Sequence, residues 1–182
     1  GVTPMQMATG YAAIANGGFR VTPYFIDRVI DESGNLLSQT EPARAEREAP
    51  RIIEPQDVFI LNSMLQDVIR VGTGRKALSL GRADLAGKTG TTNNAQDAWF
   101  AGYQRNMAAL AWVGYDQPRS LGERETGGGL ALPIWIDFMQ EALKKVPVST
   151  PEMPASVLRI NGEFYTASSA PGVGVSSLGL ED

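Results

Sequence analysis

Apolar residues recur at three-and-four spacing in three stretches of the chain, which predicts three amphipathic helices. The first begins at Thr3 and Pro4, a good N-cap and first helical residue, and ends at the glycine pair that follows Asn16. The second covers about residues 56–71, and the third covers about residues 133–146. In each stretch the apolar side chains share one face, so each helix is expected to pack against a core.

Nearly continuous apolar runs at residues 98–103 and 107–115 indicate strands that are covered on both faces. A third strand is expected at residues 84–91, and only the turn 104–106 separates the two apolar runs. Because so short a turn joins neighbouring strands, the sheet is expected to be antiparallel and not a series of βαβ units. An antiparallel sheet covered by helices is a layered α/β (α+β) architecture.

Two smaller hairpins are predicted outside this sheet. One joins residues 24–30 to residues 35–39 through a glycine-containing turn. The other joins residues 157–160 to residues 163–165 through Asn161-Gly162, a pair that is typical of two-residue hairpin loops.

Composition removes several classes of function. The 182 residues include no histidine and no cysteine, which excludes Ser-His-Asp and Cys-His catalysis and any zinc site built on those side chains. The formal net charge of -4 offers no basic stripe for phosphates, so we expect no nucleic-acid partner. Covalent chemistry would need a serine or threonine activated by lysine or a carboxylate, and we expect neither a metal nor an organic cofactor.

The last part of the predicted strand 84–91 carries the candidate chemistry. A cation beside hydroxyl groups on a strand edge suits a carboxylate, which Lys88, Thr89 and Thr91 would bind with charge-assisted hydrogen bonds. Gly90 has no Cβ, so a ligand can lie against the backbone, and an extended peptide could pair with the edge. In an ideal strand the two threonines point away from the face of Lys88, so a working site needs local twist. The segment can hold a peptide C-terminus and one oxyanion donor, but it supplies no nucleophile.

Three simpler interpretations compete with this one. A phosphate-binding P-loop needs a glycine where Arg82 stands, and it must open a helix, whereas residues 89–94 are rich in β-branched and turn-forming types. A Lys-Thr-Gly triplet also arises by chance in turns, and Lys88 could simply end a strand in solvent. The sequence around the triplet decides against both.

Several spaced motifs occur in order along residues 1–146: Gly1-Val2-Thr3-Pro4, Gly87-Lys88-Thr89-Gly90-Thr91-Thr92, Asp97-Ala98-Trp99-Phe100-Ala101-Gly102-Tyr103, Trp112-Val113-Gly114-Tyr115-Asp116, Gly127-Gly128-Gly129 and Pro133-Ile134-Trp135. In this combination the chain resembles the C-terminal part of the transpeptidase domain of class A, bifunctional penicillin-binding proteins. Residues 147–182 are interpreted as a C-terminal extension, and its Gly/Ser-rich part, residues 168–182, is expected to be mobile.

The resemblance implies a peptidoglycan D,D-transpeptidase at the periplasmic face of the bacterial inner membrane. In that family a serine attacks the D-Ala-D-Ala end of a peptidoglycan stem peptide, and the acyl group then passes to an amine of a neighbouring strand. β-Lactam antibiotics acylate the same serine, and class A members also carry a glycosyltransferase domain. The implied partners are therefore the stem peptide, β-lactams and the remainder of the same domain.

The resemblance also implies a role for each residue at the strand end. Lys88 would help to bind the substrate carboxylate and would tune proton transfer. Thr89 and Thr91 would hydrogen-bond that carboxylate, and the backbone N–H of Thr91 would be an oxyanion donor. Lys88 and Thr91 are thus the catalytic candidates, while Gly90 permits close approach and Thr92 completes the substrate-binding wall.

The nucleophile signature of the family, Ser-x-x-Lys, does not occur in this sequence, since no serine has a lysine three positions later. The spacing Ser-x-Asn occurs once, at Ser33-Gly34-Asn35, in the turn of the first predicted hairpin. In the family the Ser-x-x-Lys and Ser-x-Asn motifs, like the glycosyltransferase domain and the membrane anchor, precede the region equivalent to Gly1. The spacing most like Ser-x-x-Lys is Thr73-Gly74-Arg75-Lys76, and Thr73 is interpreted as a helix cap and not as a nucleophile. The chain is therefore expected to be part of a domain and inactive alone.

Two other functions remain open at this point, a β-lactamase-like serine hydrolase and a non-catalytic peptide-binding or scaffold module. For the remaining conspicuous residues we expect structural roles. Asp97 would orient a loop or pair with Arg105, and one of the neighbours Trp99 and Phe100 would pack in the core. Both of the other tryptophans, Trp112 and Trp135, are predicted to be core residues.

Overall fold

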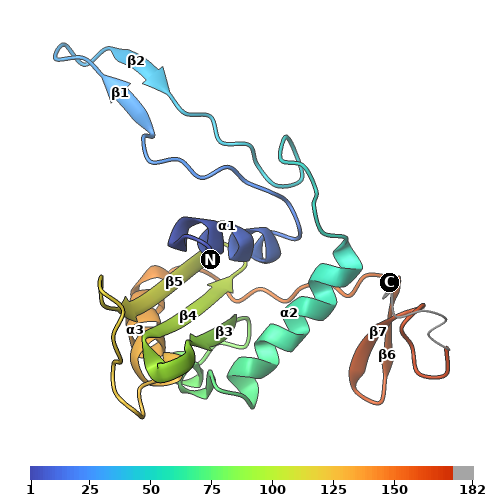
Figure 1. Ribbon diagram of the computed structural model, residues 1–182. Helices are drawn as coiled ribbons and strands as arrows, with labels where there is room; N and C mark the ends of the chain where they lie inside the picture. The colour runs from blue at the N-terminus through green and yellow to red at the C-terminus, as the bar shows by residue number, and fades with distance from the viewer. Residues whose placement is uncertain (174–182) are drawn as a thin grey trace, which may run out of the picture.

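The computed structural model describes residues 1–173, and its centre is a three-stranded antiparallel sheet (Figure 1). The strands are β3 (Ala86–Thr91), β4 (Asp97–Gln104) and β5 (Met107–Gly114), hydrogen-bonded in the order β3-β4-β5. The register places Thr89 opposite Phe100 and Gly90 opposite Trp99. The predicted mixed α/β class and the antiparallel pairing of these strands are both confirmed.

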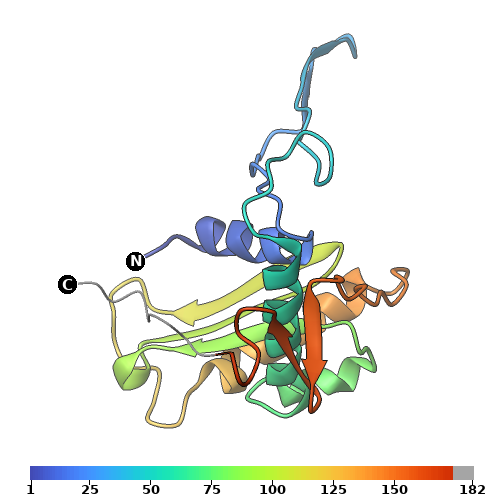
Figure 2. The same cartoon turned by 90° about the vertical axis from the view of Figure 1, so that its right-hand side faces the viewer.

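Helices lie on both faces of this sheet. Helix α1 (Pro4–Ala15) meets the face of Tyr103, whose ring lies 6.2 Å from that of Tyr11. Helix α3 (Leu132–Ala142) meets the face of Phe100, which is the opposite one because the two β4 residues are three positions apart. Helix α2 (Pro55–Arg70) lies beside β3, as the two views show (Figures 1 and 2).

The helix boundaries follow from local capping. A capping box opens α1: the Thr3 side chain accepts from the Gln6 N–H at 3.2 Å, and the Gln6 side chain accepts from the Thr3 N–H at 2.8 Å. The predicted third helix, residues 133–146, is displaced toward the N-terminus. A π-helical turn, η3 (Gly127–Ala131), precedes it because the Thr126 hydroxyl accepts from the Gly129 N–H and starts the helical path early.

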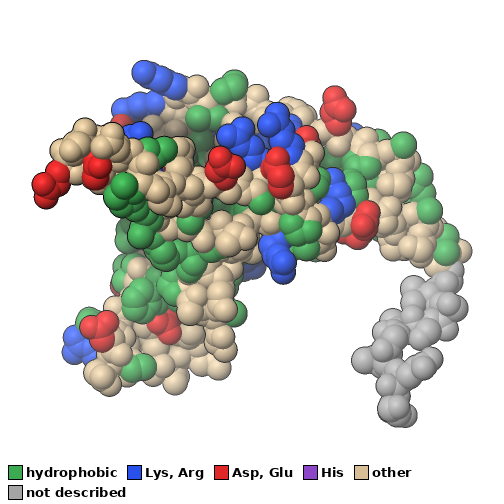
Figure 3. Space-filling view, turned by 90° about the horizontal axis from the view of Figure 1, so that it is seen from above, with side chains coloured by type: hydrophobic (Ala, Val, Ile, Leu, Met, Phe, Trp, Pro, Cys, Tyr) green, Lys and Arg blue, Asp and Glu red, His purple; other side chains and the backbone are tan. Residues whose placement is uncertain are grey.

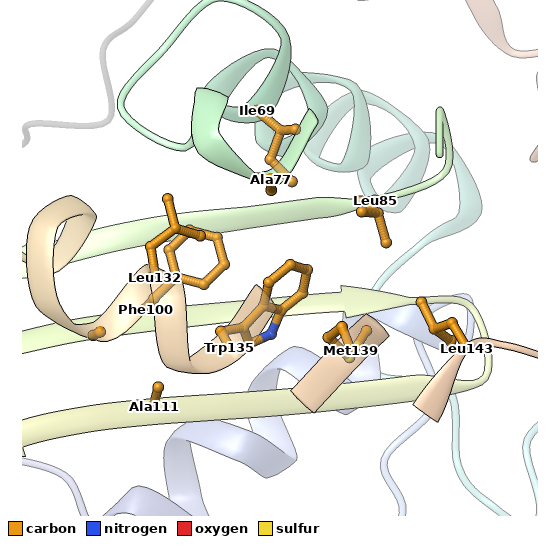
Figure 4. Close-up of a cluster of buried hydrophobic side chains, with 10 residues drawn as sticks. Ile69, Ala77, Leu85, Phe100, Ala111, Leu132, Trp135, Met139 and Leu143 are labelled. Atoms are coloured by element: carbon orange, nitrogen blue, oxygen red, sulfur yellow. The ribbon is translucent and has the colours of Figure 1, made fainter. Parts of the chain in front are cut away.

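The main core lies between the sheet and α3 (Figure 4). Trp135 is buried there as predicted, with its ring edge-on to Phe100 at a centroid distance of 4.9 Å. A Cβ on Gly102 would lie 2.8 Å from the indole, so this glycine admits the tryptophan. Ile69 of α2 and Leu85 before β3 join the same cluster, which ties β3 to both helices.

The prediction that Trp112 is a core residue is wrong, since it is 41% exposed. Its neighbour Ala111 takes the core-facing position of β5, and alternation along a strand therefore turns Trp112 to the other face. The indole Nε1–H donates to Asp97 Oδ1 at 2.8 Å, and the ring lies 5.8 Å from that of Trp99. Asp97 thus has a structural partner, but it is this indole and not Arg105.

The first predicted hairpin is shorter than expected. Strands β1 (Arg28–Ile30) and β2 (Leu36–Gln39) form it, so residues 24–27 are not strand. Pairing ends near Thr40, whose N–H donates to the Asp27 carbonyl, and Pro42 beyond it has no N–H to continue a ladder. The hairpin projects from the body of the molecule (Figure 1).

The large apolar side chains that are exposed along residues 24–40, the hairpin and the segment before it, are Tyr24, Phe25, Ile26, Val29, Ile30, Leu36 and Leu37. In the space-filling view, apolar side chains reach the surface between basic and acidic groups that are interspersed over the molecule (Figure 3). None of the helices within residues 1–173 has the length and apolar character needed to cross a membrane.

The C-terminal hairpin is confirmed, with strands β6 (Val157–Ile160) and β7 (Glu163–Thr166) around the predicted Asn161-Gly162 turn. Both turn residues have positive φ, as a two-residue hairpin loop of this kind requires. Phe164 packs edge-on against Phe59 of α2 at 5.0 Å, which holds the hairpin on that helix. Of the tail predicted to be mobile, residues 168–182, residues 174–182 lie outside the described part of the chain.

A buried carboxylate fastens the segment that leads to this hairpin. Asp84 accepts from Arg82 at 2.8 Å, from the Gln104 side chain at 3.0 Å and from the Ser149 backbone N–H at 3.0 Å. Arg82 also donates to the carbonyl of Val146 at 2.8 Å. The cluster joins the start of β3 to the chain after α3.

We expect Asp84→Asn to weaken this attachment by about 2 kcal/mol, because an amide would turn a donor toward groups that themselves donate. Burial alone raises the pKa of Asp84, but hydrogen bonds from Arg82, the Ser149 backbone and Gln104 more than offset it, so the pKa lies below its ordinary value. The stabilisation is therefore full above about pH 4 and is lost as the pH falls through the depressed pKa.

Hydrogen exchange of the Ser149 amide measures this attachment. In the wild-type chain its protection should fall in the acid range, after correction for intrinsic exchange. In Asp84→Asn the protection should be lower throughout and should not change over that range. An equal acid response in the variant would show that Asp84 is not the titrating group.

Candidate functional site

The predicted site residues occupy the second half of β3 and the turn after it. Ala86 and Gly87 are buried at the start of the strand, whereas Lys88 and Thr91 are exposed and Thr89 is half-buried. The register puts Thr89 on the face of Phe100, with Thr91 on the same face by alternation, and Lys88 on the other. The strand is therefore buried where it enters the core and accessible where the predicted site residues lie.

Lys88 overcomes the alternation by folding its side chain back to the strand. Its Nζ donates to the carbonyl oxygen of Thr89 at 2.8 Å and lies 3.4 Å from Thr89 Oγ1. The ammonium group thus meets a hydroxyl that belongs to the opposite face. The flexible side chain of Lys88 therefore reaches Thr89 without the local strand twist that alternation alone would require.

The hydroxyl of Thr91 is held by the glycine-rich turn η3. The Gly127 N–H donates to Thr91 Oγ1 at 3.1 Å. A Cβ on Gly127 would overlap the Trp99 carbonyl oxygen and would lie 2.5 Å from that of Gly90, so only glycine lets the turn come this close. Because a hydroxyl has one proton and two lone pairs, the N–H leaves the Thr91 proton available to a ligand.

The hydroxyl of Thr89 contacts a residue that the sequence did not assign to the site. Thr73 Oγ1 lies 2.6 Å from Thr89 Oγ1 across a sequence separation of 16. The interpretation of Thr73 as a helix cap is wrong, because α2 ends at the C-cap Val71 and the short helix η1 (Arg75–Leu80) has no side-chain cap bond. No periodicity in the sequence marks this contact.

Thr92 lies next to the strand end, but its hydroxyl accepts from the Asp97 N–H at 2.8 Å. It braces the short turn η2 (Asn93–Ala95), in which Asn94 and Ala95 have positive φ. The structure therefore brings Lys88, Thr89 and Thr91 together with Gly90, and it commits the Thr92 side chain to the turn.

A cavity of about 390 Å³ between α1, α2 and the segment 149–154 lies elsewhere, and no predicted site residue lines it. The candidate site is instead an open strand edge. The Lys88 ammonium group meets the Thr89 hydroxyl there, and Thr91 follows on the same face beyond Gly90. Such groups can bind a carboxylate through charge-assisted and neutral hydrogen bonds.

Comparison with known proteins matches residues 1–140 to the penicillin binding protein transpeptidase domain. Penicillin-binding protein 1A of Neisseria lactamica is 45% identical over 163 residues, which cover 90% of this chain and 20% of the relative. Penicillin-binding protein 1A of Pseudomonas aeruginosa is 40% identical over 94% of this chain and 26% of its own length. The chain thus spans about a fifth to a quarter of these curated relatives, and the similarity continues past residue 146.

Solved structures agree with these relatives. The crystal structure of penicillin-binding protein 1A from Haemophilus influenzae matches with a TM-score of 0.87 and 29% identity, over 93% of this chain and 32% of that one. The imipenem acyl-enzyme complex of penicillin-binding protein A from M. tuberculosis matches with a TM-score of 0.58 and 27% identity, over 79% and 32% of the two chains. The fold, the strand-edge site and these matches together show that the chain belongs to the penicillin-binding protein transpeptidase family.

Proposed function

We propose that this chain forms the substrate-binding wall of a peptidoglycan D,D-transpeptidase, whose nucleophilic serine lies in another part of the same domain. The observation that carries the proposal is the convergence of the Lys88 ammonium group with the hydroxyl of Thr89 on an accessible strand edge. A free C-terminal carboxylate is the group that such an edge binds best. The stem peptide that ends in D-Ala-D-Ala supplies one, and the carboxylate of a β-lactam imitates it.

Each residue then has a place in the acyl transfer. Lys88, Thr89 and Thr91 hold the terminal carboxylate, and Gly90 lets the peptide lie against β3. The serine oxygen attacks the carbonyl carbon of the penultimate D-Ala, and the Thr91 N–H donates to the oxyanion that forms. The terminal D-Ala leaves with the proton that the serine gave up. An amine of a second strand then attacks the acyl-enzyme and forms the new amide bond, and the serine leaves with the proton that the amine loses.

The chain alone is proposed to be inactive, because Ser-x-x-Lys occurs nowhere in it. Its one Ser-x-Asn spacing, Ser33-Gly34-Asn35, lies in the turn of the β1-β2 hairpin. We place residues 1–146 in the transpeptidase domain and treat residues 147–182 as its C-terminal extension. The full-length protein would act at the periplasmic face of the inner membrane, held by an N-terminal anchor. A peptidoglycan glycosyltransferase domain would accompany it.

A fluorescent penicillin tests the proposal in a full-length protein that carries this chain. Tryptic digestion should place the label on a peptide that precedes Gly1, at the serine of Ser-x-x-Lys, and on no peptide of residues 1–182. A label on Thr73 or on any serine within this chain would overturn the assignment of the nucleophile. No label at all on the folded protein would favour the non-catalytic peptide-binding module.

A further inference from the structure

The hydroxyl pair of Thr73 and Thr89 joins the candidate site to the loop between α2 and η1. The separation of 2.6 Å is that of a short O–H···O hydrogen bond, and either oxygen can be its donor. Thr73 is exposed, and this is the only side-chain hydrogen bond that it makes among residues 1–173. The bond therefore has no evident role in holding the core together.

The position of Thr73 is nevertheless closely constrained. The Gly74 N–H donates to the Val68 carbonyl at 2.8 Å, which ties the loop to the end of α2. On the other side a Cβ on Gly128 would lie 3.0 Å from the Thr73 carbonyl oxygen. The loop is thus packed between α2 and the glycine-rich turn, and both hold its hydroxyl against β3.

Counting protons decides the direction of this bond when a carboxylate is bound. A hydroxyl has one proton to donate, and an ammonium group only donates. If Thr89 gives its proton to the ligand carboxylate, its lone pairs must accept, and Lys88 Nζ already approaches one of them at 3.4 Å. Thr73 must then donate to Thr89, because the reverse direction would use the only proton of Thr89 inside the protein.

We propose that Thr73 is a positioning residue for carboxylate recognition, which donates its hydroxyl proton to Thr89 and thereby directs the Thr89 proton toward the ligand. The inference rests on the proposed function and adds a residue from outside the Lys-Thr-Gly strand to it. Thr73 does not touch the substrate. It acts through Thr89, and donation to Thr89 also strengthens the Thr89 hydroxyl as a donor.

The test compares two substrates in the full-length protein, benzylpenicillin and its methyl ester, which lacks the free carboxylate. Thr73→Val has nearly the shape of threonine without the hydroxyl, and it should slow acylation by benzylpenicillin about fivefold to tenfold. Acylation by the ester should hardly change, so the ratio of the two second-order rate constants should fall. Thr73→Ser keeps the hydroxyl and should preserve the wild-type ratio.

Thr89→Val separates failure of this inference from failure of the proposed function. If Thr89→Val also leaves the acid-to-ester ratio unchanged, the carboxylate site itself is wrong. If Thr89→Val lowers the ratio and Thr73→Val does not, only the role of Thr73 is overturned. Equal slowing of both substrates by Thr73→Val would mean a general structural effect and would overturn it too. Should Thr73→Val lower the thermal midpoint, Thr73→Ala repeats the comparison.

Discussion

Replacing Lys88 with alanine should slow β-lactam acylation of the full-length protein about a hundredfold, the loss expected for one charged hydrogen bond to a bound carboxylate. The side chain is exposed and, within the described residues, its hydrogen bonds go to Thr89 alone, so the fold should not depend on it. The measurement is the second-order rate constant for fluorescent penicillin, with the thermal midpoint recorded for each variant.

Lys76→Ala is the matched control for this substitution. Lys76 is another exposed lysine, located on η1 and not on β3, and its replacement changes the net charge of the protein equally. Its acylation rate should equal that of the wild type. If Lys88→Ala reacted as fast as this control, Lys88 would have no part in substrate binding.

Gly127→Ala should be the most damaging small substitution near the site. The new Cβ would overlap the Trp99 carbonyl oxygen and lie 2.5 Å from that of Gly90, and neither backbone group can move aside without distorting the sheet. We expect a loss of about 3 kcal/mol from this overpacking. Displacement of the turn would also remove the N–H that orients the Thr91 hydroxyl, so acylation should fall about tenfold.

Gly129→Ala tests the same turn with little overlap, because its Cβ would meet side-chain atoms alone, the Thr126 hydroxyl at 3.3 Å and a Glu125 carboxylate oxygen at 4.0 Å. That variant should melt and react much like the wild type. The two thermal midpoints and the two acylation rates are measured in parallel. Wild-type behaviour of Gly127→Ala would refute the account of how Thr91 is held.

Local patterns in the sequence determined most of the secondary structure. The apolar runs at residues 98–103 and 107–115 correspond to β4 and β5, and Asn161-Gly162 marks the C-terminal hairpin. These features depend on the preferences of neighbouring residues, which periodicity and turn chemistry record. Where a boundary depended on more distant groups, as at residues 24–27, the prediction failed.

Trp112 shows the limit of such patterns. An apolar run covered on both faces does not say which face meets the core and which meets a polar partner. The indole is 41% exposed because Asp97, fifteen residues earlier, lies within reach of its N–H. Hydrophobicity alone assigned the residue to the core, and only the pairing of β4 with β5 placed the carboxylate beside it.

For this protein the sequence by itself determined most of the elements and the family resemblance, and it predicted that residues 88–91 form a carboxylate-binding strand end. Only the tertiary structure decided how their hydroxyls are oriented. Thr73 meets Thr89 across 16 residues, and Gly127 meets Thr91 across 36. Contacts at such separations arise from the packing of α2 and η3 against β3, and short-range patterns in a sequence carry no record of that packing.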